Sequence, residues 1–277
     1  MTRPHTALTP GVAPARVLIV AGSDSGGGAG IQADIKTVTA LGGYAATAIS
    51  AITVQDSMAV HDVFPLPAHL VAAQMRVVLG DIGADVIKTG MLQDRAVIDA
   101  VVAQIDAQAA ETPLIVDPVM VSTSGHRLID QAAREALKTA LVPRATLLTP
   151  NLAEAADLLG HDIASEPVAM AEAAEALLAM GPKAVLVKGG HGTADRVVDC
   201  LATPGGTEHF AALRIATRHT HGTGCTLASA LAEGVGRGLG LVDAVARGRA
   251  FVHGALSAAP GFGAGHGPLG HHWMITS

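Results

Sequence analysis

The sequence predicts an α/β fold in which a doubly wound, mainly parallel sheet carries helices on both faces. Two features of the chain predict it. Short apolar runs alternate with helical patterns of roughly 10–15 residues along almost the whole sequence, as in consecutive βαβ units. In addition, the run at 114–117 ends in an aspartate, as parallel strands often do where their carboxyl ends meet a ligand site.

The composition fits one domain of this class. The chain has 277 residues, 49% of them hydrophobic, and a formal net charge of −6. No apolar run reaches the roughly 18 residues of a membrane span, and there is no basic run, so we expect neither a membrane nor a nucleic acid as partner. Residues 1–15 lack the apolar core of a signal peptide. We therefore expect a flexible N-terminal extension at 1–15, a single domain over 16–277 and a cytoplasmic protein.

The cysteines and histidines indicate no transition-metal centre. Cys200 and Cys225 lie far apart without metal-site spacing, and the sequence alone leaves a disulfide between them open. The thirteen histidines are scattered. Their closest set, at 266, 271 and 272, lies in a glycine-rich segment over 265–272 that we expect to be a loop, with no carboxylate or thiolate beside it.

The first strand is predicted at 16–21, where the run is apolar and β-branched. It leads into a glycine-rich loop at 22–30 and a helix whose apolar residues recur at helical spacing from Ile31 to Leu41. The loop meets neither the dinucleotide-binding pattern G-x-G-x-x-G nor the P-loop pattern, which ends in Gly-Lys-Ser/Thr. A dinucleotide-dependent oxidoreductase is therefore disfavoured. Strand, glycine-rich loop and helix in succession are nevertheless typical of ligand sites in parallel sheets.

The rest of the chain continues the alternation. Strands are predicted at 44–53, 84–88, 114–117, 146–149 and 184–188, helices at 67–80, 93–109, 166–180, 225–236 and 241–258, and an antiparallel hairpin at 196–202 and 207–213. Polar or sulfur-containing residues follow these strands directly; they are Gln55, Met91, Asp117, Asn151 and Lys188. Because parallel strands end at one edge of a sheet, we expect these residues to share a site.

Each of these residues also has a purely structural interpretation. Gln55 offers a donor and an acceptor to a nitrogen heterocycle, or it is a solvated loop residue. Met91 lines a ligand or fills the core. Asn151 and Glu154 share a face at a helix start, where they hold Mg²⁺ through water or form a capping box. Lys188 neutralises phosphate charge or simply ends its strand in solvent.

The segment 220–226 feeds two glycines directly into a helical pattern. A helix start leaves backbone N–H groups without intrahelical partners and carries partial positive charge. Gly222 and Gly224 would let an anion, such as a transferring phosphoryl group, approach closely. We expect the same field to lower the pKa of the Cys225 thiol. Alternatively, the glycines only form a tight turn and Cys225 is a small buried hydrophobe.

Five motifs in order carry a resemblance to a known family. They are GSDSGGGAGIQAD at 22–34, DPVM at 117–120, TPNLAE at 149–154, KGGH at 188–191 and HGTGC at 221–225. This series resembles the hydroxymethylpyrimidine/phosphomethylpyrimidine kinases of thiamine biosynthesis, within the ribokinase-like superfamily. The resemblance covers roughly residues 16–273, and although each motif is weak alone, the ordered set is highly specific.

The resemblance implies a ribokinase-like fold, a homodimer and two successive phosphorylations that use ATP and Mg²⁺. The first acts on the hydroxymethyl group of 4-amino-5-hydroxymethyl-2-methylpyrimidine, and the second acts on the resulting monophosphate. It implies substrate contacts from Gly22, Asp34, Val54, Gln55 and Met91; nucleotide contacts from Asn151, Lys188 and Thr223; metal contacts from Asp117, Asn151 and Glu154; and an anion-binding turn at Gly222, Thr223, Gly224 and Cys225.

One residue departs from the wider superfamily. Sugar kinases with this fold carry an aspartate base where this chain has Cys225, and a thiol of reference pKa about 8.5 is a poorer base. The phosphate of the second substrate is already ionised, so we expect Cys225 to matter more for the first step than for the second. The resemblance leaves two alternatives: a pyridoxal kinase, or a non-catalytic pyrimidine-binding regulator.

Overall fold

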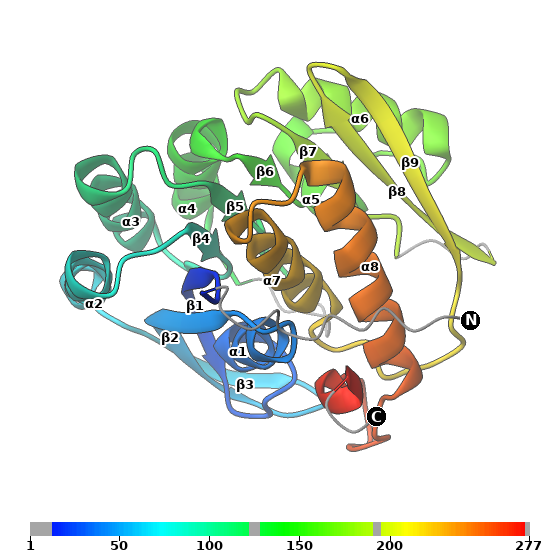
Figure 1. Cartoon of the computed structure of the whole chain (residues 1–277), viewed down its shortest axis with the longest axis horizontal. Coiled ribbons are helices and arrows are strands. Elements are labelled where there is room, and N and C mark those ends of the chain that lie inside the picture. The colour runs from blue at the N-terminus through cyan, green and yellow to red at the C-terminus, as the bar shows by residue number, and fades with distance from the viewer. Residues whose placement is uncertain (1–12, 122–127, 191–194, 275–277) are drawn as a thin grey trace.

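The computed structural model describes residues 13–121, 128–190 and 195–274 (Figure 1). The expectations for residues 1–12 and for His191 lie outside these ranges. Ala15 is buried, and its carbonyl oxygen accepts a hydrogen bond of 2.8 Å from the Tyr44 N–H, so this residue packs against the domain. Ala15 therefore belongs to the domain, and the rest of the predicted extension stays a prediction.

The described residues form one nine-stranded sheet in the order β3-β2-β1-β4-β5-β6-β7-β8-β9. The strands are β1 (Arg16–Asp24), β2 (Tyr44–Gln55), β3 (Val60–Pro65), β4 (Val86–Thr89), β5 (Leu114–Val116), β6 (Leu147–Leu148), β7 (Val185–Val187), β8 (Arg196–Thr203) and β9 (Gly206–Leu213). The strands from β2 across to β7 are parallel, whereas β3, β8 and β9 run antiparallel to their neighbours. The sheet is thus mainly parallel, as predicted.

Helices cover both faces of the sheet (Figure 1). One face carries α2 (Ala68–Asp81), α3 (Arg95–Gln108), α4 (Gln131–Ala136), α5 (Leu152–Leu159) and α6 (Pro167–Leu178), and the other carries α1 (Gly30–Ala40), α7 (Thr223–Gly236) and α8 (Leu241–Ser257). Short helical turns lie at Leu137–Leu141, Val142–Arg144 and His271–Met274. Among the described residues, no helix is long and apolar enough to cross a membrane.

The strand β1 is a continuous apolar run because both of its faces are covered by helices. Leu18 and Val20 pack into the core under α2 and α3, while Val17 and Ile19 pack into the core under α1, α7 and α8. All four side chains are fully buried. Burial of one such side chain stabilises a fold by about 1.5–3 kcal/mol, so a strand covered on both faces needs apolar residues at successive positions.

Several elements differ from the sequence-based expectation. The strands β1 and β2 extend to Asp24 and Gln55, so Gln55 ends a strand instead of following one. The strand β3 was not predicted because its residues are at least partly exposed and include His61, Asp62 and Pro65, which suits an edge strand but leaves no apolar run. The expected loop at 265–272 ends earlier, because a 3₁₀ turn begins at His271 and runs to Met274.

A buried ion pair joins the sheet to both helices that begin near the glycine-rich segments. Lys88, the penultimate residue of β4, lies 3.0 Å from each carboxylate oxygen of Asp34 on α1. Both side chains have no solvent exposure. Ser229 of α7 donates a third hydrogen bond, of 2.7 Å, to Asp34. Burial is the largest single effect and lowers the pKa of Lys88, but the surrounding negative charges, that of Asp34 foremost, and the Asp34 hydrogen bond together outweigh it and raise the pKa, so the ammonium stays charged.

We expect Lys88→Met to lower the free energy of unfolding by about 3–5 kcal/mol, because it leaves the Asp34 carboxylate buried without its partner. Arg95→Met, which removes an exposed pair with Asp99, should cost less than about 0.5 kcal/mol. Urea unfolding monitored by circular dichroism measures both. A second substitution, Asp34→Leu, should restore part of the loss; a cost below 1 kcal/mol for Lys88→Met alone would contradict the assignment.

Candidate active site

Three predicted site residues form one group at the carboxyl edge of the sheet, which we call the charged cluster: Asp117, Glu154 and Lys188. Asp117 follows β5, Lys188 follows β7, and Glu154 lies in the first turn of α5. Lys188 Nζ donates to Asp117 Oδ1 at 2.9 Å and lies 3.9 Å from Glu154 Oε2. All three side chains are largely buried. The shared edge of parallel strands brings together residues that lie up to 71 positions apart.

The start of α7 borders the charged cluster. A Cβ atom placed on Gly224 would lie 3.3 Å from Lys188 Nζ and 3.7 Å from Asp117 Oδ2. The absence of a side chain there leaves the first turn of α7 facing the ammonium group. Backbone N–H groups at a helix start and a lysine ammonium both attract anions. The geometry therefore supports an anion site between Lys188 and the turn at 222–225.

The charges of the cluster are set by burial and by each other. Burial raises the pKa of Glu154 to about 7, although the Lys188 ammonium opposes the rise. For Lys188, burial lowers the pKa, but the charges of Asp117 and Glu154 outweigh it and raise the pKa. Lys188 therefore stays charged, and near neutral pH Glu154 is close to its titration point.

Asn151 caps α5, which was the structural alternative for this residue. Its Oδ1 accepts from the Glu154 N–H at 2.9 Å, and Glu154 Oε2 accepts from the Asn151 N–H at 2.8 Å. This reciprocal pair is a capping box. The cap holds the Glu154 carboxylate in place beside Lys188. A direct nucleotide or metal contact from Asn151 stays a prediction, as does nucleotide contact from Thr223, whose hydroxyl donates to the Thr220 carbonyl at 2.6 Å.

The glycine-rich loop and the turn before α7 are packed backbone to backbone. Gly222 has φ +81°, and a Cβ there would overlap the carbonyl oxygen of Gly28. A Cβ on Gly28 would lie 2.5 Å from the His221 ring. Gly222 is therefore required by backbone conformation and close packing, which was the structural alternative for it. Gly224 differs, because it is the glycine that faces the charged cluster.

The thiol of Cys225 differs from the prediction. Burial raises its pKa to about 12, because the low-dielectric surroundings disfavour the thiolate more than the Lys88 charge and a hydrogen bond from the Gly30 N–H favour it. The helix start was expected to lower this pKa. Cys225 and Cys200 are both free thiols, so the chain has no disulfide.

A second group, which we call the loop bridge, consists of Asp24, His221 and Gln55. Asp24 Oδ2 lies 2.9 Å from His221 Nε2. The amide of Gln55 lies 3.1 Å from the same ring nitrogen. The loop bridge joins the end of β1, the end of β2 and the turn before α7. His221 and Gly224 are three residues apart, so this one turn contacts both the loop bridge and the charged cluster.

The other predicted substrate contacts lie in three different settings. A Cβ on Gly22 would lie 2.5 Å from the terminal methyl of Met91, so these two residues are in contact near Gln55's strand. Val54 is 56% exposed on β2, where its partner in β3 is Asp62. The carboxylate of Asp34 is fully buried and bonded to Lys88 and Ser229. In this structure Asp34 anchors Lys88 and Ser229, and a substrate contact from Asp34 stays a prediction.

Sequence reasoning missed three residues: Asp24, Lys88 and His221. Asp24 and His221 stand inside recognised motifs. They were treated as parts of glycine-rich segments, and their contact with each other was not predicted. Lys88 ends an apolar strand just as Lys188 does, so the local pattern is the same for both. Only their burial separates them: Lys88 is fully enclosed under the site, and Lys188 lies at its edge.

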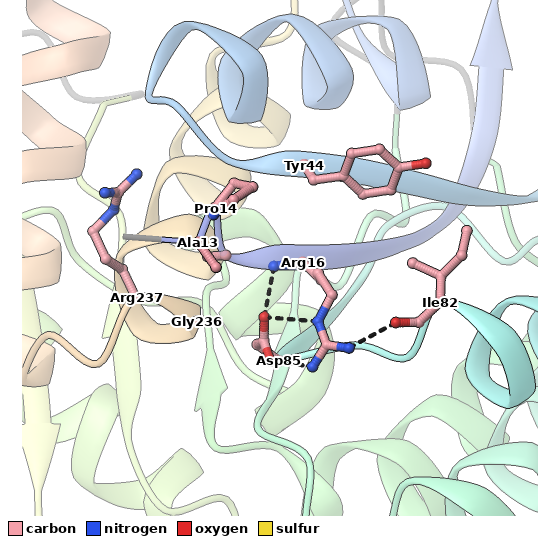
Figure 2. Close-up of a pocket in the computed structure, with 9 residues that line it drawn as sticks. Ala13, Pro14, Arg16, Tyr44, Ile82, Asp85, Gly236 and Arg237 are labelled. Carbon is pink, nitrogen blue, oxygen red and sulfur yellow. Dashed lines mark hydrogen bonds and ion pairs between the residues drawn. The ribbon is translucent and has the colours of Figure 1, made fainter. Parts of the chain in front are cut away.

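A cavity of about 560 Å³ lies at the opposite end of the sheet (Figure 2). It is lined by Ala13, Pro14, Ala15, Arg16, Tyr44, Ile82, Asp85, Gly236 and Arg237. Arg16 and Tyr44 are the first residues of β1 and β2, so the cavity is at the amino-terminal ends of these strands. Figure 2 shows Arg16 donating hydrogen bonds to Asp85 and to the Ile82 carbonyl oxygen. Ligands of doubly wound sheets bind at the carboxyl ends, so we place the active site at the charged cluster and the loop bridge.

Solved structures establish the class of protein that this fold and site define. The chain matches the ADP complex of Bacillus subtilis pyridoxal kinase with a TM-score of 0.88 and 32% identity, over 96% of this chain and 100% of that one. It matches Clostridium difficile phosphomethylpyrimidine kinase with a TM-score of 0.77 and 35% identity, over 86% and 98%. The chain is therefore a kinase with the ribokinase-like fold, as the resemblance implied.

Sequence comparison narrows the class to a family. A family profile described as phosphomethylpyrimidine kinase matches residues 24–270. A hydroxymethylpyrimidine/phosphomethylpyrimidine kinase from Streptomyces coelicolor is 46% identical over 271 residues, which cover 98% of this chain and 99% of the relative. The chain belongs to the phosphomethylpyrimidine kinase family.

Gly222→Ala should cost about 3–5 kcal/mol of unfolding free energy, since it adds a steric overlap to an unfavourable positive φ. Gly160→Ala is the matched control: its φ is +82°, and nothing lies within 4 Å of the added Cβ. The control should therefore cost only about 1–2 kcal/mol. Denaturant unfolding compares the two, and equal costs would show that the loop and the turn are not tightly packed.

Glu154→Gln should stabilise the protein increasingly as the pH rises from 5 to 8. The pKa of Glu154 is raised from about 4.5 to about 7 on folding, so above pH 4.5 the folded state binds more protons and wild-type stability falls. Glutamine keeps the cap acceptor without this cost. We expect a relative gain on the order of 1–3 kcal/mol at pH 8 in urea unfolding. The exposed Glu172→Gln is the control; a gain that is independent of pH would contradict the raised pKa.

Proposed function

We propose that this protein transfers the γ-phosphoryl group of ATP to the hydroxymethyl group of 4-amino-5-hydroxymethyl-2-methylpyrimidine and then to the resulting monophosphate, for thiamine diphosphate biosynthesis. The observation that carries the proposal is the position of Lys188 Nζ beside Gly224, at the first turn of α7. Family membership and the Streptomyces coelicolor relative support the choice of substrate.

The site supplies what phosphoryl transfer needs, which is mainly positioning and charge stabilisation. The backbone N–H groups of Gly222, Gly224 and Cys225 would hold the transferring group, whereas that of Thr223 already donates to the Thr220 carbonyl at 3.3 Å. Lys188 would neutralise part of the negative charge of this group. Asp117 and Glu154 form a pair of buried carboxylates beside this position. Such a pair fits Mg²⁺, which commonly binds one or two carboxylates together with substrate phosphates and offsets their charge.

Gln55 would bind the pyrimidine ring. Its amide presents a donor and an acceptor, as a ring nitrogen next to an exocyclic amine requires. Gly22 lets the Met91 side chain approach β1, and Met91 is nearly buried there, so it would form an apolar wall for the ring. Contact from the more exposed Val54 stays a prediction.

ATP consumption by the purified protein with Mg²⁺ tests the proposal, with hydroxymethylpyrimidine, its monophosphate and pyridoxal offered separately. Turnover of both pyrimidines, with diphosphate formed from the monophosphate, is the expected outcome. Turnover of pyridoxal alone would assign the protein to vitamin B6 salvage, an alternative that the similarity to Bacillus subtilis pyridoxal kinase supports. Tight pyrimidine binding without turnover would instead indicate a non-catalytic regulator.

Cys225→Ala should lower the rate of the first phosphorylation more than that of the second. A hydroxymethyl group must lose a proton, whereas a phosphate monoester with a pKa near 6 is already ionised at pH 7. Because the thiol pKa is about 12, we expect a loss of about tenfold in the first step, smaller than for a well-matched base. The second step should change less than about threefold. Separate kcat measurements test this, and equal losses would contradict it.

The homodimer and the cytoplasmic location remain predictions from the resemblance and the composition. Light scattering coupled to size-exclusion chromatography measures the oligomeric state directly.

A further inference from the structure

Asp24 holds the glycine-rich loop and His221 at the same time. Its Oδ1 accepts from the Gly26 N–H at 2.8 Å, and its Oδ2 accepts from the N–H groups of Gly28 at 3.0 Å and Ala29 at 2.8 Å. Oδ2 also lies 2.9 Å from His221 Nε2. Asp24 is almost fully buried. A carboxylate that accepts from this many N–H groups is held in place as an acceptor, so any further atom bonded to it must donate a hydrogen.

The partner atom of His221 must therefore carry a proton. Burial raises the pKa of Asp24, but the hydrogen bonds from His221, Ala29 and Gly26 outweigh it and lower the pKa, so the carboxylate is ionised. An ionised carboxylate only accepts hydrogen bonds. Hence His221 Nε2 bears the hydrogen that points at Asp24, and the same nitrogen cannot accept a hydrogen bond from Gln55.

This protonation determines the orientation of the Gln55 amide. The amide atom 3.1 Å from His221 Nε2 must be the oxygen, because an N–H group there would face another N–H. The second neighbour requires the same arrangement: Thr53 Oγ1 gives its only hydrogen to the Ser23 carbonyl at 3.0 Å, so the amide atom 3.3 Å away must donate. With the amide oxygen toward His221 and the amide nitrogen toward Thr53, both neighbours are satisfied.

We propose that His221 is a positioning residue. Held by Asp24, it fixes the amide orientation of Gln55 and thereby determines the orientation in which the substrate ring binds. The inference rests on the proposed function, in which Gln55 binds the ring. With the amide oxygen on the His221 side, the exocyclic amine of the pyrimidine lies on that side too. The hydroxymethyl group is on the next ring carbon, so it is directed toward the turn at 222–225, which begins beside His221.

Two substitutions of His221 separate positioning from packing. His221→Met removes the donor and keeps a large side chain, whereas His221→Gln keeps an N–H donor at a similar distance from the backbone. The kcat and KM are measured for hydroxymethylpyrimidine, for pyridoxal and for ATP. Pyridoxal has no amine next to its ring nitrogen, so it depends less on the amide orientation.

For His221→Met we expect kcat/KM for hydroxymethylpyrimidine to fall about tenfold relative to that for pyridoxal, as for one lost orienting hydrogen bond. If wild type does not turn over pyridoxal, the fall is measured against the KM for ATP, which should change less than twofold. His221→Gln should keep the ratio within about threefold of wild type. If His221 had a purely structural role, His221→Met would lower kcat/KM for all substrates together, and His221→Gln would not restore it.

A double-mutant cycle with Gln55→Ala tests whether His221 acts through Gln55. In the Gln55→Ala background, His221→Met should change kcat/KM for hydroxymethylpyrimidine less than about twofold. Independent, multiplying effects would overturn the inference, and so would an unchanged ratio in the single variant. If wild type does not phosphorylate hydroxymethylpyrimidine at all, the proposed function fails first, which distinguishes the two failures.

Discussion

The ion pair between Lys88 and Asp34 is the constraint on which the site depends. It lies at the carboxyl end of β4, and together with Ser229 it ties the sheet to α1 and α7, the helices that begin next to the two glycine-rich segments. Its charges are fully buried. A buried pair of this kind seldom adds net stability over apolar packing, but breaking it is costly, so it enforces one arrangement of the two helices.

Above this pair, the short turn from His221 to Cys225 connects the two halves of the site. His221 contacts Asp24 and Gln55, the proposed substrate side, and Gly224 faces Lys188 and Asp117, the proposed phosphate side. The turn is itself packed against the glycine-rich loop at Gly28. Under the proposed function, a turn shared by both halves would position the acceptor group and the transferring group relative to each other, and such positioning is a large part of catalysis in phosphoryl transfer.

Much of the fold and part of the site follow from local pattern. Apolar runs and helical spacing predicted the parallel sheet, and the residues after its strands include Asp117 and Lys188, which the structure brings to 2.9 Å. The exposed strand β3 escaped prediction because it lacks an apolar run. Asp34 was predicted to contact the substrate because it belongs to a recognised motif. Its ion-pair partner Lys88 lies 54 residues away, and no local sequence pattern indicates that this lysine pairs with Asp34.

The sequence by itself determined the fold class, the order of the elements and the edge of the sheet that carries the candidate site. It could do so because strand ends and helix starts are encoded by short-range sequence patterns. The ordered motifs also identified the family. Only the tertiary structure decided the partners and the protonation of the site residues. Asp24 and His221 are 197 residues apart, and the raised pKa values of Glu154 and Cys225 come from burial by distant segments. Hydrogen-bond partners and local dielectric depend on what the folded chain places around a group, and no short stretch of sequence contains that information.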